Sequence, residues 1–279
     1  MTHSPSLLSQ LPHQSCFYAM SSGQNFLSVT KAKTAMHAVV ILPPFAEEMN
    51  KSRHIIKQCT KKLAEHNYYS FMLDNYGTGD SEGDLDTATI ELWRTDLAIL
   101  IQKIADWGFT SISFIGIRFG ALQLFDLLNN TNLPLPIKQV VLWQPMFDAA
   151  RFWQQFCRIK VAEAMANGDK LSQKQIEQQL EQGQIVEIAG YPINSSFVQS
   201  ILQMESTLPA VLNNSPLSWF ELSKLDNVAL PVQKVRDSLT EKCLLHFKQI
   251  KADAFWQTSE LAEANQLLAL TINQFAGAE

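Results

Sequence analysis

The fold of this chain is decided by the stretch Ser111-Ile112-Ser113-Phe114-Ile115-Gly116-Ile117-Arg118-Phe119-Gly120, which the apolar helical pattern of residues 121–128 follows. A strand, a turn of the form Gly-x-X-x-Gly and a helix follow one another in the layout of a nucleophile elbow. Its glycines let strand and helix approach closely, so the middle side chain has to point outward at the carboxyl edge of a sheet. The middle residue is usually Ser, but here it is Arg118, whose guanidinium stays protonated and cannot attack a carbonyl. The sequence therefore predicts the scaffold of a nucleophilic enzyme without its nucleophile.

Apolar strands and amphipathic helices alternate on both sides of the elbow. The runs at 37–42, 68–73 and 137–143 are typical of buried central strands, and helical periodicity covers about 49–66 and 87–107. Such alternation predicts an α/β fold with a mostly parallel sheet and right-handed crossovers.

This alternation is interrupted after Met146. Helical patterns at 147–167, 172–182 and 195–205 replace the buried strands, and the α/β pattern returns with a strand near 217–222. We expect the insertion to form a helical cap over the carboxyl edge of the sheet, where it either shapes a pocket or serves packing only. The predicted organisation is a flexible tail at 1–14, a first part of the core at 15–146, the cap at 147–210 and a second part of the core at 211–279.

Composition and charge exclude several classes of protein. The hydrophobic fraction of 46% and the charged fraction of 18% are ordinary for a soluble globular protein. A net charge of −5, with no Lys/Arg cluster, argues against nucleic acid as a partner. No run of about 18 apolar residues exists, so we expect no stable membrane insertion. The polar N-terminus lacks the features of a signal peptide, which makes the cytoplasm the default location.

The four cysteines predict neither disulfides nor a metal site. Cys16, Cys59, Cys157 and Cys243 form no C-x-x-C pair and have no His at metal-ligand spacing. They are typical of separate buried thiols in a reducing compartment, and a reactive or metal-binding thiol is the minority interpretation. We expect no metal and no cofactor.

A glycine-rich loop after the strand at 68–73 narrows the fold class. It reads Asp74-Asn75-Tyr76-Gly77-Thr78-Gly79-Asp80-Ser81 and is similar to the Asp-x-Arg-Gly-x-Gly-x-Ser loop of α/β-hydrolases, with Tyr76 where that family has Arg. Together with the elbow it predicts the α/β-hydrolase fold. Asp74 and Ser81 are expected to have structural roles.

The loop at 43–53 stands where an α/β-hydrolase places one of its two oxyanion amides. In that template one amide comes from this loop and the other from the residue after the elbow residue. Here they would be an amide near Phe45 or Ala46 and the amide of Phe119. Because backbone amides need no particular side chain, the oxyanion hole could survive the loss of the nucleophile.

Two adjacent acids, Glu47 and Glu48, follow in the same loop. A guanidinium at the positive end of a helix is unfavourable without an anion, so Arg118 needs one. Either Glu47 or Glu48 pairs with it, or a ligand carboxylate or phosphate does, and we favour the internal pair. Such a pair can hold the loop without doing chemistry. Lys51 and Arg53 are expected to be solvated.

The other two members of a Ser-His-acid triad should follow the elbow in chain order. The acid position after the strand near 217–222 offers Glu221 or Asp226. The His position holds Ala254, followed by two aromatic residues, and His246 lies inside a strand. His3, His13, His37, His54 and His66 lie far from the expected place, so no triad can be assembled.

The candidate site residues are therefore acids, a cation, aromatic residues and loop amides. Glu47 and Glu48 are the catalytic candidates; Arg118, Phe45, Ala46, Phe119, Glu221 and Trp256 are the ligand-binding candidates.

Seven stretches of the chain also resemble one family. They are residues 43–53, 77–81, 116–121, 142–145, 189–191, 219–221 and 255–256, and the longest reads Pro-Pro-Phe-Ala-Glu-Glu-Met-Asn-Lys-Ser-Arg. The family is the second type of α/β-hydrolase-like protein of exosortase A systems, which bacteria encode with exopolysaccharide and PEP-CTERM protein-sorting genes. An Arg at the elbow and a missing terminal His belong to its pattern. The resemblance implies a cytoplasmic role near exopolysaccharide export and protein sorting, and it supplies no substrate, because fold does not settle activity.

Two functions from different classes remain open at this point. The favoured one is a catalytically inert protein that binds a carboxylate- or phosphate-bearing small molecule, or a partner protein, beneath the cap. The alternative is a hydrolase of acyl esters or thioesters. Arg118 would then bind an anionic group, the loop amides would stabilise charge, and Glu47 or Glu48 would act as general base on water.

Overall fold

The computed structural model describes residues 11–12, 14–33, 36–213, 215–258 and 262–276. Its described part contains an eight-stranded sheet in the order β1-β2-β4-β3-β5-β6-β9-β10. The strands β3, β4, β5, β6, β9 and β10 run parallel to one another, while β2 pairs antiparallel with both β1 and β4. The predicted α/β class with a mostly parallel sheet is confirmed.

The strands and helices have the following bounds. The strands of the sheet are β1 (Cys16–Ala19), β2 (Gln24–Thr30), β3 (His37–Leu42), β4 (Tyr69–Leu73), β5 (Ser111–Ile117), β6 (Ile137–Trp143), β9 (Pro216–Leu222) and β10 (Leu244–Ile250). The helices that flank it are α1 (Glu47–Glu65), α2 (Ile90–Asp106), α3 (Phe119–Asn130), α7 (Leu230–Thr240) and α8 (Asn265–Ala276).

The helices cover the two faces of the sheet in separate layers. Alternation along β3 sends Val39 and Ile41 to the face covered by α1 and α8, while Ala38, Val40 and Leu42 face α2 and α3. Both sets are fully buried, which explains why the central strands are apolar throughout. Helices therefore cover both faces of the sheet, and a binding site is expected at its carboxyl edge, where the parallel strands end.

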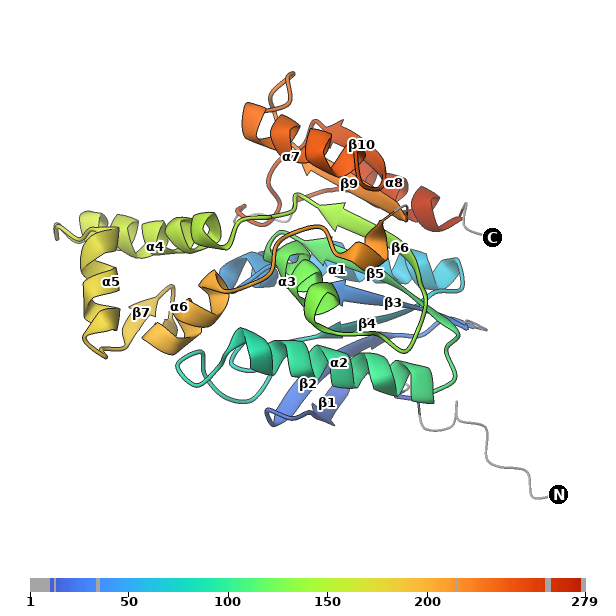
Figure 1. Ribbon diagram of the computed structural model, residues 1–279, viewed down its shortest axis with the longest axis horizontal. Helices are drawn as coiled ribbons and strands as arrows, with labels where there is room; N and C mark the ends of the chain where they lie inside the picture. Colours follow the sequence, from blue (N-terminus) through green and yellow to red (C-terminus); the bar gives the residue numbers. More distant parts are fainter. Residues whose placement is uncertain (1–10, 13, 34–35, 214, 259–261, 277–279) are drawn as a thin grey trace.

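Between β6 and β9 the chain builds the segment that we call the cap, residues 147–210. It contains α4 (Ala149–Ala166), α5 (Gln173–Glu181), a hairpin of β7 (Val186–Ile188) and β8 (Tyr191–Ile193), and α6 (Ser195–Leu202). A short 3-10 turn at Ala210–Leu212 leads back to the sheet. The cap lies at one end of the molecule, on the left in Figure 1.

Several smaller expectations can now be compared with the structure. Most of the predicted tail at 1–14 lies outside the described residues, but Leu11 is buried against the core and is not part of a loose tail. The last helix, α8, begins at Asn265. All four cysteines are free thiols, and all but the half-buried Cys16 are buried. Within the described residues, no helix combines the length and apolarity that a membrane crossing requires.

Candidate functional site

The predicted elbow is present at the junction of β5 and α3. Arg118 is the N-cap of α3 and has φ 55° and ψ −117°, a conformation that L-residues rarely adopt. Its N–H donates to the carbonyl of Trp143 at 3.0 Å, and its own carbonyl accepts from the amides of Ala121 and Met146 at 3.1 Å each. These bonds tie the turn to the end of β6 and hold the strained backbone in place.

The two elbow glycines act as the sequence predicted. A Cβ at Gly120 would lie 2.0 Å from the carbonyl oxygen of Leu42, and one at Gly116 would lie 2.9 Å from Cα of Ala121. Such distances are impossible for real atoms, so only glycine allows α3 to approach β3 and β5 this closely.

Backbone strain extends beyond the elbow along the same edge of the sheet. Ala46 follows β3 with φ 54°, Arg118 follows β5 with φ 55°, and Gln144 follows β6 with φ 44°. These three strands are consecutive neighbours in the sheet. Strained non-glycine residues concentrate at functional sites, so the alignment marks this edge as the candidate site.

The internal ion pair that the sequence favoured is formed by Glu48. Nε and Nη2 of Arg118 donate to the two carboxylate oxygens of Glu48 at 3.2 and 3.1 Å. The side chain of Arg118 is 12% exposed and that of Glu48 is 29% exposed, so the pair is shielded without being sealed. Glu47 instead faces solvent and accepts a hydrogen bond from Nδ2 of Asn50.

Trp256 completes the surroundings of the guanidinium. The central carbon of Arg118 lies 4.9 Å from the centroid of the indole ring, in cation–π geometry. The ring is buried, and its Nε1–H has no hydrogen-bond partner among the described residues. A buried donor without a partner costs free energy.

Glu221 lies on β9, deeper in the sheet edge. Its carboxylate accepts from Nε2 of Gln144 at 2.8 Å and from Nε1 of Trp219 at 2.9 Å, and it is almost fully buried. Burial raises the pKa of Glu221, while the two hydrogen bonds and the charge of Arg118 act in the opposite direction. Gln144 is held in turn because its Oε1 accepts from the amide of Leu222 at 2.5 Å.

The structure distinguishes between the two acids considered for a triad. Asp226 is exposed and pairs with Lys251 at the surface, so only Glu221 lies at the sheet edge beside Arg118. Ala254 lies half-buried in the loop after β10, and His246 faces solvent on the strand before it. His3 and His13 lie outside the described residues. Arg118 therefore has no histidine base beside it in the described part of the chain.

A small cavity opens between the ion pair and the cap. Its volume is about 70 Å³. The polar part of its lining comes from Glu47, Glu48, Arg118 and Gln155, and the apolar part from Phe45, Ala46, Met146, Phe152, Phe156, Ile159 and Ala189. Such a lining suits a ligand with one polar head and a short apolar tail.

Aromatic rings fill most of the space beneath the cap. Phe45 is buried, and its ring centroid lies within 5.1 to 6.3 Å of six others. These belong to Trp93, Phe119, Phe152, Phe156, Tyr191 and Phe197. The cavity remains small because Phe45 projects from the oxyanion loop into the cluster. The amides of Phe45, Ala46 and Phe119 make no hydrogen bond to another described residue, so the oxyanion hole stays a prediction.

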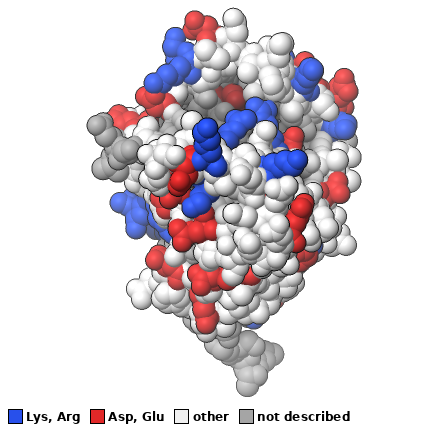
Figure 2. Space-filling view, turned by 90° about the vertical axis from the view of Figure 1, so that its left-hand side faces the viewer, with Lys and Arg blue, Asp and Glu red and all other residues white. Residues whose placement is uncertain are grey.

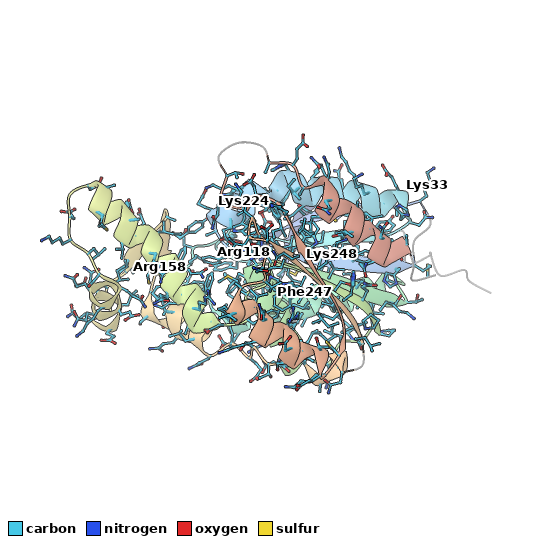
Figure 3. All side chains as sticks on the ribbon, turned by 90° about the horizontal axis from the view of Figure 1, so that it is seen from above. Lys33, Arg118, Arg158, Lys224, Phe247 and Lys248 are labelled. Carbon is cyan, nitrogen blue, oxygen red and sulfur yellow. The ribbon has the colours of Figure 1, made fainter. Side chains whose placement is uncertain are left out.

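Basic and acidic side chains both reach the surface at the cap-bearing end of the molecule. Figure 2 shows Lys and Arg side chains gathered around a hollow in the upper half of the cap-bearing end. Figure 3 places Arg118 at the middle of the molecule and Arg158 on the cap helix α4.

The glycine-rich loop has the structural role that the sequence assigned to Asp74 and Ser81. Oγ of Ser81 donates to the backbone carbonyl of Asp74 and accepts from the amide of Phe26. The expectation of a solvated Arg53 is wrong, because its Nη2 donates to the fully buried carboxylate of Asp74 at 2.6 Å. Since Tyr76 stands where the hydrolase loop has Arg, the guanidinium for Asp74 comes from α1 instead. The exposed Lys51 donates to the carbonyl of Gln257.

Sequence reasoning missed Gln144 and the cap residues around the cavity. Gln144 carried a usable signal, since a polar residue directly after a buried parallel strand lies at the carboxyl edge. Phe152 and Phe156 carried none, because aromatic residues at helical spacing are equally typical of ordinary core.

Comparison with known proteins supports the fold and leaves the function open. No protein-family model and no curated protein matches the chain. Among solved structures, it resembles XC6422 from Xanthomonas campestris, described as an α/β serine hydrolase without lid, with a TM-score of 0.56, 11% identity and coverage of 95% of this chain and 96% of that one. It also resembles an α/β serine hydrolase homologue from Coxiella burnetii, with a TM-score of 0.54, 15% identity and coverage of 95% of this chain and 99% of that one. A third similar structure is Est1E from Butyrivibrio proteoclasticus, solved with ferulic acid bound. Its TM-score is 0.59 and its identity 14%, with coverage of 91% of this chain and 93% of that one. The chain therefore has the α/β-hydrolase fold.

Proposed function

We propose that this α/β-hydrolase-fold protein binds a short-chain carboxylate at Arg118 and does not carry out the serine-hydrolase reaction. The observation that carries the proposal is the two-bond ion pair between Arg118 and Glu48, which borders a cavity with apolar walls. The elbow presents a binding group at the position where the fold normally presents a nucleophile.

Glu48 occupies the place that a ligand carboxylate would take. A carboxylate that accepts from Nε and Nη2 of arginine is the preferred partner of a guanidinium, whether it belongs to the protein or to a ligand. Glu48 is 29% exposed and sits on the first turn of α1, so it can turn outward to water when a ligand arrives.

The size of the cavity limits the ligand. Its volume of about 70 Å³ is less than half that of a cavity of about 150 Å³ that holds benzene, so it admits only a few heavy atoms without movement of the rings. Acetate and propionate fit this description, and longer chains require Phe45 or its neighbours to shift. The biological setting that we propose, near exopolysaccharide export and PEP-CTERM protein sorting, rests on the sequence resemblance.

The test is calorimetric titration of the purified protein with acetate, propionate, butyrate and hexanoate. We expect Arg118→Met to abolish binding, since it removes the charge and keeps most of the stem. Glu48→Gln should tighten binding about tenfold, because it removes the competing internal carboxylate. The control is Arg158→Met, which removes an exposed arginine of the cap and should leave the affinity unchanged.

Two outcomes would contradict the proposal. If Glu48→Gln weakens binding as much as Arg118→Met does, then Glu48 is part of the binding site and not a competitor. If the protein hydrolyses short acyl esters or thioesters and Glu47→Gln or Glu48→Gln abolishes that turnover, the chain is an enzyme with a nonstandard Glu/Arg site.

A further inference from the structure

A second cavity lies between the core and the cap, and none of its lining residues borders the first. Its volume is about 300 Å³, at the lower end of the range for small-molecule sites of about 300 to 1,000 Å³. Its walls come from α1, from the glycine-rich loop at 77–84 and from the β7–β8 hairpin of the cap. We propose that this cavity binds a small zwitterion of the α-amino acid class.

The cationic part of the lining is the guanidinium of Arg53 on α1. Only Nη2 of Arg53 is engaged, by Asp74, while Nε and Nη1 make no hydrogen bond to a described residue. The side chain is 30% exposed. Nε and Nη1 can therefore both donate to a carboxylate, which is the preferred partner of a guanidinium.

Gly79 leaves the guanidinium open to the cavity. It has φ +59°, and a Cβ there would lie 2.6 Å from Nη2 of Arg53 and 2.2 Å from Oδ2 of Asp74. Any larger residue would therefore displace the ion pair or cover it. The loop approaches Arg53 by its backbone alone, as in sites where a ligand has to reach a buried charge.

The anionic part of the lining is supplied by the loop. The carboxylates of Asp80 and Asp84 are exposed, and neither forms an ion pair or hydrogen bond with a described residue. A ligand ammonium would meet these two acids, and the half-buried ring of Tyr191 on the cap hairpin adds an aromatic wall.

The charge balance of the lining selects the ligand class. Arg53 is already paired with Asp74, so a simple cation would meet Asp80 and Asp84 but would leave Nε and Nη1 of Arg53 without an acceptor. A simple anion that accepts from these two nitrogens would lie beside two carboxylates that have no cation among the described residues. A neutral polyol uses the hydrogen-bonding groups but neutralises neither charge. A molecule that carries both a carboxylate and an ammonium satisfies both, because each of its charges finds an opposite one.

The test starts from the complete chain and the twenty common L-amino acids, each examined by thermal shift and the strongest by calorimetry. The N-acetyl and the amide derivatives of the strongest binder each lack one charge, and we expect each to bind at least tenfold more weakly. Asp84→Asn and Asp80→Asn should weaken binding of the amino acid about tenfold. Both side chains are exposed, so neither variant should impair folding.

Matched controls separate this cavity from the Arg118 site. Asp86→Asn changes the same kind of residue two positions further along, outside the cavity lining, and should leave the affinity unchanged. Arg118→Met should leave it unchanged too, whatever that variant does to carboxylate binding. The proposal is overturned if no amino acid binds, if either derivative binds as tightly as its parent, or if both Asp variants bind as the wild type does.

Discussion

Ala46 adopts nearly the same unusual backbone conformation as the elbow residue Arg118, although its methyl side chain has no functional group. Its φ of 54° and ψ of −130° nearly repeat those of Arg118, and each residue is the N-cap of a helix that follows a parallel strand. The carbonyl of Ala46 accepts from the amide of Met49, just as that of Arg118 accepts from Ala121. The oxyanion loop is therefore a second strained turn beside the first, and its strain can be measured by substitution.

We expect Ala46→Gly to be nearly neutral for stability. Glycine removes strain of about 1 to 3 kcal/mol, which offsets the loss of a buried methyl group and the greater freedom of the unfolded chain. The control is Ala121→Gly, at an equally buried position in α3, where the same change should cost about 2 kcal/mol. Urea unfolding of both variants gives the comparison. Equal losses would show that Ala46 is not strained.

Glu221 should make stability depend on pH. Because burial raises its folded pKa above the ordinary 4.5, the folded state holds the proton more tightly than the unfolded state does. Stability is therefore lost as the pH rises from about 4.5 through the folded pKa, and it is level above that value.

The measurement is the free energy of unfolding between pH 4 and pH 8 for the wild type and for Glu221→Gln, which cannot titrate. The wild-type value minus the variant value should fall as the pH rises and then become constant. The matched control variant is Glu241→Gln, at an exposed position after α7. A difference that is flat or rises with pH would contradict the assignment.

At the scale of elements, α1 is joined to the glycine-rich loop by one ion pair. Asp74 is fully buried, and its Oδ2 accepts from Nη2 of Arg53 and from the amide of Asp80. We expect Arg53→Met to cost about 3 kcal/mol, because it keeps the stem but leaves a buried carboxylate without its cation. Urea unfolding measures the loss, and Lys57→Met, one turn further along α1 and exposed, should change stability by less than about 0.5 kcal/mol. If the two variants lost similar amounts of unfolding free energy, Arg53 would contribute no more to stability than an ordinary surface residue.

The elements themselves were predictable because each carries its own periodic signal. The central strands are buried on both faces and so read as unbroken apolar runs, and the flanking helices read as amphipathic. The elbow was predictable from Gly116 and Gly120, whose need for close approach is a local property. Helix ends shifted by a few residues, since fraying and capping decide them and not periodicity.

Contacts between distant elements were not predictable in the same way. The sequence allowed either Glu47 or Glu48 to meet Arg118, and only the direction in which α1 leaves its strained turn decides for Glu48. Arg53 was expected in solvent because nothing along α1 indicates that Asp74 lies beside it. The place of Gln144 at the sheet edge was predictable, but its role was not, because that role depends on Glu221, which lies on another strand.

At the scale of the whole molecule, cap and core share one aromatic cluster. Phe45, Trp93 and Phe119 from the core pack against Phe152, Phe156 and Phe197 from the cap. Polar contacts reinforce the junction. The amide of Glu205 donates to Asp126, that of Ile90 donates to Ser200, and Nδ2 of Asn194 donates to the carbonyl of Asp86. Such a junction predicts that the cap has no stability of its own.

Phe197→Ala tests this directly. Phe197 lies on α6, is fully buried and contacts the rings of Phe45 and Trp93, so its truncation should cost about 3 to 5 kcal/mol. Because cap and core form one cooperative unit, we expect calorimetry to show one unfolding transition, shifted as a whole to lower temperature. Ile185→Ala, which truncates an exposed side chain of the same cap, should leave that transition in place. Two separate transitions in the Phe197 variant, with the later one unshifted, would instead identify the cap as an independent lid. The cavity at Arg118 could then open without disturbing the sheet, and the limit that we place on ligand size would no longer hold.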